Sequence, residues 1–301
     1  MKFVCFKDAD RMAMGLLIAD QVLDLAAAAK LSGDQADYSS MLAIIRGGDQ
    51  TLRAARQLAA TSGKLAAALR PLAGLQLLAP IGQLQRNAFC VGRNYVDHVK
   101  EGAKVVGVDL KLPVVPQFFT KATHTLNAPH GDVRLDEKLT KSFDYEVELA
   151  VIIGRGGRDI SAEQAMSHVF GYSVANDFTA RDLQRRHDQW FKGKSLDTTL
   201  PLGPCIVDAE EIGDPTTLEL SLTVNGEERQ RAHVSQMIFN IPTIISSLSA
   251  GLTLEAGDVI ATGTPSGVGF AMTPPRPLKA GDVVVTRVDR IGELHNRIVA
   301  V

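Results

Sequence analysis

The sequence predicts an α+β protein in which β-strands predominate, and three observations lead to this prediction. After residue 85, short apolar stretches of strand length follow one another, separated by glycine and proline. There is no regular alternation of strands with helices, which argues against a parallel α/β sheet. Residues 39–70, in contrast, have an alanine-rich helical pattern. We therefore predict a small N-terminal α/β domain over residues 1–80 and a larger, mostly β domain over residues 81–301.

The N-terminal region begins with short strands and continues with helices. Strands are expected over residues 2–6, 14–19 and 21–25, where the apolar pattern is interrupted by glycine and aspartate. Two short apolar helix faces follow, separated by Gly47 and Gly48. We expect this region to be a structural or dimer-supporting appendage that carries no chemistry.

The composition is that of a globular protein without a nucleic-acid or membrane partner. The chain has 301 residues, 45% of them hydrophobic and 22% charged, and its net charge is −2. No apolar stretch approaches the ~20 residues that span a bilayer. Cys5, Cys90 and Cys205 lie far apart in apolar surroundings, as buried thiols of a reducing compartment do. We expect a cytoplasmic protein without disulfides or a zinc site.

The strongest chemical signal is a group of acidic residues that leads into an apolar stretch. In a β-strand, Asp144, Glu146 and Glu148 lie on one face, and residues 149–153 are apolar at every position. A carboxylate carried into such a buried strand needs a cation or a proton. Asp177 follows a second apolar strand pattern and completes a candidate cluster for Mg²⁺ or Mn²⁺, which prefer oxygen ligands. A solvated strand face would give the same local pattern.

Three further residues are candidates for catalysis. His98 and Glu101 are three apart, so on a helical turn the carboxylate would orient the histidine as a general base. A surface ion pair has the same spacing. Lys194 follows an aromatic pair and a glycine, and it would be drawn to a carboxylate cluster as a counter-charge or substrate clamp. An ordinary loop lysine is the alternative.

Three more residues are candidates for substrate binding. Arg181 and Gln184 are three apart after Asp177 and would lie on one side of a helix, which a solvated polar face would also explain. Thr264 lies in a glycine-rich loop that lacks the ending of a nucleotide-binding P-loop. Backbone N–H groups of such a loop can receive a carboxylate, although a plain turn is equally compatible.

Several segments, in this order, together resemble the fumarylacetoacetate hydrolase family. The resemblance covers about residues 85–300, and its most specific parts are the E-x-E segment and the N-D-x-T-A-R-D-x-Q segment. The matching segments are residues 92–101 (GRNYVDHVKE), 118–121 (FFTK), 144–154 (DYEVELAVIIG), 170–184 (FGYSVANDFTARDLQ), 193–197 (GKSLD), 202–204 (LGP), 224–227 (VNGE), 241–242 (IP) and 258–269 (DVIATGTPSGVG).

This resemblance implies a mixed β-sandwich roll around a metal site, usually in a homodimer. It implies that Mg²⁺ or Mn²⁺ is held by Glu146, Glu148 and Asp177. It also implies a catalytic water-activating pair on a lid, a lysine in the transition-state environment and three substrate contacts. The water-activating pair is His98 with Glu101, and the lysine is Lys194. The three substrate contacts are Arg181, Gln184 and Thr264.

The implied activity is metal-dependent hydrolysis of a C–C bond in aromatic-compound catabolism. The substrate would be an acylpyruvate-type 2,4-dioxo acid, such as fumarylpyruvate or a fumarylacetoacetate-like acid, and the products pyruvate and a carboxylic acid. His98 would take a proton from water, and the ion and Lys194 would stabilise the pyruvate enolate that departs. Alternatives are oxaloacetate decarboxylase, hydroxymuconate isomerase or decarboxylase, oxo-acid hydratase, and a non-catalytic sensor or scaffold that binds metal and an oxo-acid.

Overall fold

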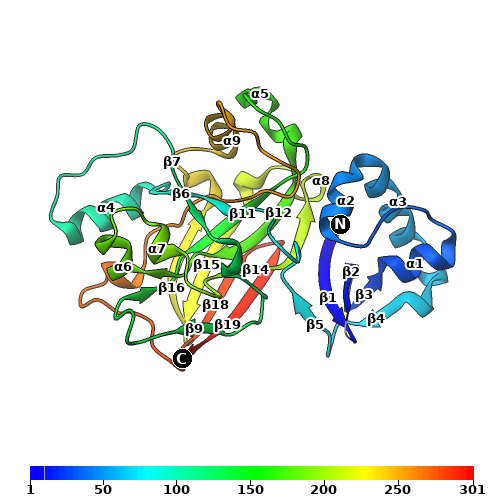
Figure 1. Ribbon diagram of the computed structural model, residues 1–301, viewed down its shortest axis with the longest axis horizontal. Helices are drawn as coiled ribbons and strands as arrows, with labels where there is room; N and C mark the ends of the chain where they lie inside the picture. The colour runs from blue at the N-terminus through cyan, green and yellow to red at the C-terminus, as the bar shows by residue number, and fades with distance from the viewer. Residues whose placement is uncertain (10) are drawn as a thin grey trace.

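The computed structural model describes residues 1–9 and 11–301, and its centre is a large mixed sheet (Figure 1). Two further strands extend this sheet: β5 (Gln76–Leu78) pairs with β1 (Lys2–Asp8), and β8 (Leu126–Asn127) pairs with β14 (Leu200–Asp208). The strand order along the sheet is β4 (Leu69–Pro71), β3 (Gln21–Asp24), β2 (Arg11–Ile18), β1 (Lys2–Asp8), β14 (Leu200–Asp208), β12 (Val169–Asn176), β11 (Val147–Ile153), β17 (Val259–Ala261), β6 (Ala88–Gly92) and β7 (Gln117–Lys121).

A second, smaller sheet packs against the middle of the first. Its hairpin turns at Asn225 and Gly226, whose φ angles of 51° and 80° fit the type I′ turn that Asn-Gly predicts. A separate two-stranded pair is formed by β10 (Phe143–Asp144) and β13 (Thr179–Ala180). The order of the smaller sheet is β16 (Glu227–His233), β15 (Glu219–Val224), β18 (Val283–Val288), β19 (Gly292–Ala300) and β9 (Val133–Leu135).

The main core lies between the two sheets. From β11 it receives Val147, Leu149 and Val151, and from β18 it receives Val284 and Val288, all of them buried. Strand β11 is hydrogen-bonded on both edges, to β12 and to β17, and a core covers each of its faces, so every residue of Val147–Ile153 is buried. The mixed sheets and the excess of strand over helix confirm the predicted α+β, mostly β fold with a sandwich arrangement.

The opposite face of the large sheet is covered in part by the N-terminal helices α1 (Leu25–Ser32), α2 (Met41–Arg46) and α3 (Gly48–Ala60). Ala150 and Ile152 of β11 belong to this second core. The N-terminal strands are part of the same sheet, because β1 pairs with β14 through Lys2 opposite Val207 and Phe3 opposite Ile206. A domain division at residue 80 therefore stays a prediction, since hydrogen bonds and a core cross it.

Helix α1 was not predicted from the sequence. We expected a strand up to residue 25 and helices only from residue 39 onwards, whereas the chain is helical over Leu25–Ser32. The chain turns from strand to helix at Asp24, whose side chain accepts a hydrogen bond from the Ala27 backbone at 3.0 Å. An aspartate at this position satisfies an N–H group that the first helical turn leaves free. Gly33, with a φ of 79°, ends the helix.

Helices α4 (Val96–Val106), α6 (Arg181–Arg186) and α7 (Phe191–Lys194) lie at the end of the molecule away from the N-terminal helices (Figure 1). Within the described ranges, no helix is long and apolar enough to cross a membrane. The three cysteines are buried and unpaired, as predicted. The remaining helices are α5 (Ala162–Ala165), α8 (Ala209–Ile212) and α9 (Ile241–Ser249).

Candidate active site and metal centre

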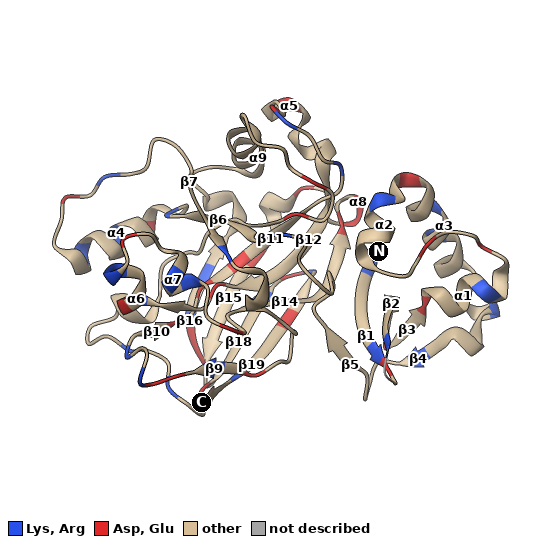
Figure 2. Ribbon diagram, in the orientation of Figure 1, with Lys and Arg blue, Asp and Glu red and all other residues tan. Residues whose placement is uncertain are grey.

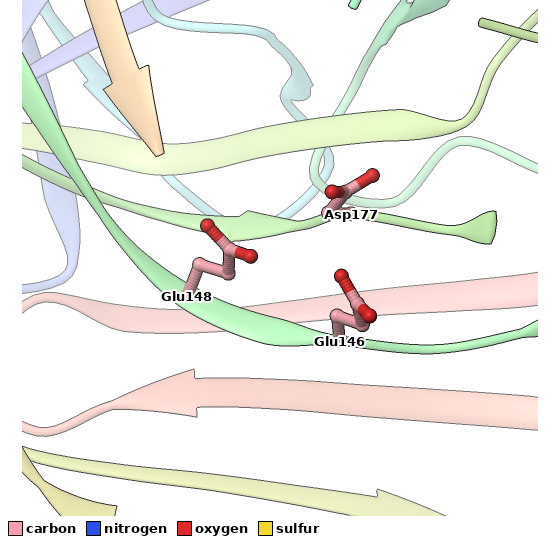
Figure 3. Close-up of side chains that lie close together, drawn as sticks. All are labelled: Glu146, Glu148 and Asp177. Atoms are coloured by element: carbon pink, nitrogen blue, oxygen red, sulfur yellow. The ribbon is translucent and has the colours of Figure 1, made fainter. Parts of the chain in front are cut away.

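Three carboxylates converge where β11 and β12 pair. Val147 lies opposite Asn176, and the backbone N–H of Asp177 donates to the Glu146 carbonyl at 2.9 Å, which brings the two acidic residues together. Glu148 lies two residues further along β11, on the face of Glu146. One oxygen of each carboxylate lies within 4.8 Å of the others (Figure 3). The solvated strand face is excluded, because all three side chains are buried.

Glu148 is anchored by the glycine-rich loop. Its Oε2 accepts a hydrogen bond from the backbone N–H of Gly263 at 2.8 Å. Gly263 has a φ of 103°, and a Cβ there would lie 2.7 Å from the Cβ of Asn94, so the position requires glycine. A backbone N–H of the glycine-rich loop therefore binds a carboxylate, as the sequence analysis allowed. That carboxylate is the side chain of Glu148 and not a substrate.

Lys194 lies between two of the acidic residues. Its Nζ donates to Glu146 Oε2 at 2.6 Å and to Asp177 Oδ2 at 2.7 Å, and its side chain is 2% exposed. The short helix α7 reaches the cluster because Gly193 packs directly on α6, where a Cβ would lie 2.4 Å from the Gln184 backbone nitrogen. Lys194 is therefore a buried counter-charge and not an ordinary loop lysine.

Lys121 is a second buried lysine of the cluster, and the sequence analysis assigned it no role. Its Nζ donates to Asp177 Oδ1 at 2.8 Å, to the Phe178 carbonyl at 3.1 Å and to the carbonyl of Lys194. Both oxygens of Asp177 thus contact lysines, which fixes the orientation of its carboxylate. The available signal was that Lys121 ends an apolar strand segment, FFTK.

Arg181 connects the cluster to a fourth acidic residue. Its guanidinium forms ion pairs with Glu146 at 2.7 Å and with Asp144 at 3.0 Å, and lies 4.6 Å from the centre of the Phe270 ring. Asp144 does not join the other acidic residues, because the strand is interrupted between β10 and β11. Gln184 approaches Arg181 Nη1 with its Oε1 at 3.4 Å, as expected for a pair one helical turn apart.

The charges of the cluster suit a divalent cation. Burial and the neighbouring charges of Asp177 and Glu146 raise the pKa of Glu148 well above its usual range. Burial opposes ionisation of Glu146, but the charges of Arg181 and Lys194 outweigh it and lower the pKa of Glu146. The positive charges of Arg181 and Lys194 therefore keep Glu146 ionised, whereas Glu148 favours its protonated form. Since all the donors are oxygens, the residues present fit Mg²⁺ or Mn²⁺.

Metal binding should release a proton from Glu148. A carboxyl ligand has to be deprotonated, and the raised pKa of Glu148 means that the metal-free protein holds a proton there at low pH. The apparent affinity for Mn²⁺ should therefore rise with pH until Glu148 is ionised in the free protein. Calorimetry in two buffers of different ionisation enthalpy, on the acid side of this transition, measures the release, for which we expect about one proton. Release of no proton in this range would contradict the assignment.

The cluster opens into a cavity of about 450 Å³ between α4, α6 and α7. Asp177 and Glu101 lie just behind its wall, bonded to Lys194 and His98 respectively. The other seven residues proposed from the sequence line it together: His98, Glu146, Glu148, Arg181, Gln184, Lys194 and Thr264.

His98 and Glu101 form a hydrogen-bonded pair on α4. His98 Nδ1 lies 2.8 Å from Glu101 Oε1, and the Gly267 backbone N–H donates to Glu101 Oε2 at 2.9 Å. Because an ionised carboxylate can only accept, Nδ1 carries the proton and Nε2 of the neutral ring keeps a lone pair. The His98 side chain is 12% exposed and faces the cavity, so a proton acceptor lies beside the acidic cluster.

Thr264 is held by a residue that the sequence did not single out. Gln230 Nε2 donates to Thr264 Oγ1 and to the Pro265 carbonyl, both at 2.8 Å, while Gln230 Oε1 accepts from the Val147 backbone at 3.0 Å. Gln230 is buried on β16, a strand that is otherwise mostly exposed and polar. It therefore ties the loop of Thr264 to the strand that carries the acidic residues.

A mixed β-sandwich with a buried cluster of three carboxylates, next to a histidine–carboxylate pair, is an arrangement that suits a metal-dependent enzyme. Residues 87–299 match the model of the fumarylacetoacetate hydrolase C-terminal domain. The chain belongs to the fumarylacetoacetate hydrolase family and is an enzyme of that family.

Similar proteins cover the whole chain. Oxaloacetate tautomerase YisK of Bacillus subtilis is 46% identical over 99% of this chain and 100% of its own length. The structure of a fumarylacetoacetate hydrolase from Exiguobacterium antarcticum has a TM-score of 0.82 and 39% identity, covering 100% of both chains. Maleylpyruvate hydrolase of Sphingobium sp. SYK-6, in complex with manganese(II) and pyruvate, has a TM-score of 0.77 and 30% identity, covering 100% of this chain and 99% of its own. A divalent metal in this family thus has a precedent in a solved relative.

Proposed function

We propose that this protein is a Mg²⁺- or Mn²⁺-dependent tautomerase of a short 2-oxo acid, with oxaloacetate as the first substrate to test. The observation that carries the proposal is the His98–Glu101 pair, which faces the same cavity as the acidic cluster and Lys194. Enolisation needs a proton acceptor beside a site that stabilises negative charge on oxygen. The full-length similarity to an oxaloacetate tautomerase supports this choice of substrate.

In this proposal His98 moves the proton. Its Nε2 takes a proton from C3 of the oxo-acid, the electron pair forms the C2–C3 double bond, and the C2 oxygen receives the negative charge. The imidazolium then returns a proton to that oxygen, so the enol forms with no net change in protons. Glu101 keeps the ring in the required tautomer and stabilises its charged form through the 2.8 Å contact.

The remaining residues hold the substrate and its developing charge. Glu146, Glu148 and Asp177 would hold the ion, which supplies positive charge next to the oxygen that becomes negative. Lys194 and Arg181 are buried cations that line the cavity, and in this proposal they would stabilise the charge on that oxygen. Thr264 and Gln184 offer a hydroxyl and an amide for hydrogen bonds to the carboxylate and the oxo group.

Hydrolysis of an acylpyruvate is the second candidate, and it is the activity that the sequence motifs suggested first. The same His98 Nε2 that accepts a carbon-bound proton can accept one from water. The similarity to a maleylpyruvate hydrolase whose structure holds pyruvate supports this reading. Decarboxylation, isomerisation and hydration would use the same stabilised negative charge, but the described contacts favour none of them over tautomerisation.

One assay separates the candidates. Purified protein with Mg²⁺ or Mn²⁺ is mixed with freshly dissolved oxaloacetate, and the keto–enol equilibration is followed by the ultraviolet absorbance of the enol. Parallel reactions with 2,4-dioxopentanoate are analysed for acetate and pyruvate. We expect accelerated equilibration that a chelator abolishes, without carbon dioxide release. Release of two acids, with no effect on oxaloacetate, would replace the tautomerase by the hydrolase.

A further inference from the structure

The cavity contains two arginines that the acidic cluster does not use. Four basic side chains and three acidic side chains line it, with one histidine. Two of the bases, Arg181 and Lys194, are paired with buried acidic residues. The other two are Arg93 and Arg185, and the acidic residue in this outer part is Asp188. The outer part of the cavity therefore carries an excess of positive charge.

Arg185 has unused hydrogen-bond donors. It lies on α6 four residues after Arg181, so the two side chains occupy the same side of the helix, ~6 Å apart at their Cβ atoms. Among the described residues, the Arg185 side chain forms no hydrogen bond and no ion pair within 4 Å, although Asp188 follows it closely in sequence. Figure 2 shows the basic positions of α6 beside those of α7. A guanidinium without a partner at a cavity wall is available to an anionic ligand.

Arg93 reaches the same cavity from a different segment. Its backbone is fixed there, because Gly92 packs against the Trp190 ring so closely that a Cβ would lie 2.3 Å from a ring carbon. The φ angle of Arg93 is 57°, which directs the chain sharply after β6. Its Nη2 donates to the Lys111 carbonyl at 2.9 Å, and its other donors have no partner among the described residues.

Part of the cavity wall is apolar. Phe119, Trp190 and Phe270 line it, with Val99 and Ala103 from α4. Apolar walls keep water away from a bound ligand and strengthen its interactions with charged groups. One turn of α6 separates Arg181 from Arg185, a spacing comparable to the length of an extended four-carbon dicarboxylic acid. A monocarboxylic acid would leave the outer arginines unpaired.

We propose that Arg93 and Arg185 bind the second carboxylate of a dicarboxylic 2-oxo acid and so select dicarboxylic over monocarboxylic substrates. The proposal rests on the proposed function for the position of the first carboxylate at the inner cluster. It assigns substrate selection to α6 and to the residue after β6, outside the residues that hold the ion.

The test compares two stable ligands that differ in one group. Malate has a carboxylate where 2-hydroxybutyrate has a methyl group, and neither is consumed by tautomerisation. Binding is measured by the fluorescence of Trp190, which is the only tryptophan in the sequence and lines the cavity, in the presence of Mg²⁺. We expect the wild-type protein to prefer malate, and Arg185→Gln and Arg93→Gln each to weaken malate binding about tenfold. Binding of 2-hydroxybutyrate should stay unchanged.

Arg186→Gln is the matched control. Arg186 is the next residue of α6, is exposed and does not line the cavity, so its removal changes the net charge equally. An equal loss of malate affinity in Arg186→Gln would overturn the proposal in favour of a general charge effect. An unchanged preference for malate in both the Arg185 and the Arg93 variants would overturn it as well.

Failure of this proposal and failure of the tautomerase proposal give different results. Selective loss of malate binding in a protein that turns over no oxaloacetate would reject the proposed function and keep the selection of dicarboxylates. Turnover of oxaloacetate with unaltered ligand preference in the arginine variants would do the reverse.

Discussion

Glu148→Gln should abolish divalent-metal binding and metal-dependent turnover while leaving the fold intact. Glutamine has the shape of the protonated carboxyl that burial and the charges of Asp177 and Glu146 favour, and its oxygen can still accept from the Gly263 backbone. The neutral amide lacks the charge that a hard cation needs from its ligands. Mutation of a residue that only hydrogen-bonds to a metal ligand lowers activity by up to about 100-fold. Because Glu148 is a proposed ligand itself, we expect turnover to fall by more than that.

Titration calorimetry with Mn²⁺ and a thermal unfolding curve check this result. The melting temperature should stay within about 4 °C of the wild type, which corresponds to a change of ~1–2 kcal/mol for a chain of this size. Glu137→Gln is a matched control, since Glu137 is exposed and does not line the cavity. Full metal-dependent activity in Glu148→Gln would reject Glu148 as a ligand.

His98→Ala should reduce turnover by ~10²–10⁴-fold, the usual contribution of general acid–base catalysis, and leave Mn²⁺ affinity unchanged. The reason is geometric. The ring is hydrogen-bonded to Glu101 and to none of the three clustered carboxylates. Its removal therefore takes away a proton acceptor without removing a metal ligand.

Steady-state kinetics and metal titration of the same preparation separate the two effects. Glu101→Gln, which keeps the size of the side chain and removes its charge, should cause a smaller loss in turnover because His98 stays in place. His124→Ala, at an exposed histidine outside the cavity, should behave as the wild type. A parallel decrease in turnover and in Mn²⁺ affinity for His98→Ala would contradict the role of His98 as a base.

The acidic cluster was predictable because two simple rules apply to the same segment. Alternation places Glu146 and Glu148 on one face, and the apolar stretch that follows shows that the strand is buried. Asp177 could be added because it directly follows the next buried strand, which pairs with the first. The spacing of His98 and Glu101 likewise predicted a contact that depends only on one helical turn.

The partners of these residues were not predictable, because they depend on how distant segments pack. Lys121 meets Asp177 across 56 positions of sequence, and Gln230 meets Thr264 across 34. Asp144 has the alternation of its neighbours, but a break in the strand turns it towards Arg181. Local patterns describe which face a residue occupies, and they carry no information on which other segment that face meets.

The pairing of β1 with β14 protects one edge of the large sheet. Without β1, the end of β14 around Ile206 and Val207 would be a sheet edge, with unpaired N–H and C=O groups next to a buried apolar surface. Such edges attract strands from other chains and promote aggregation. The first residues of the chain therefore act as a protective cover for this edge of the large sheet.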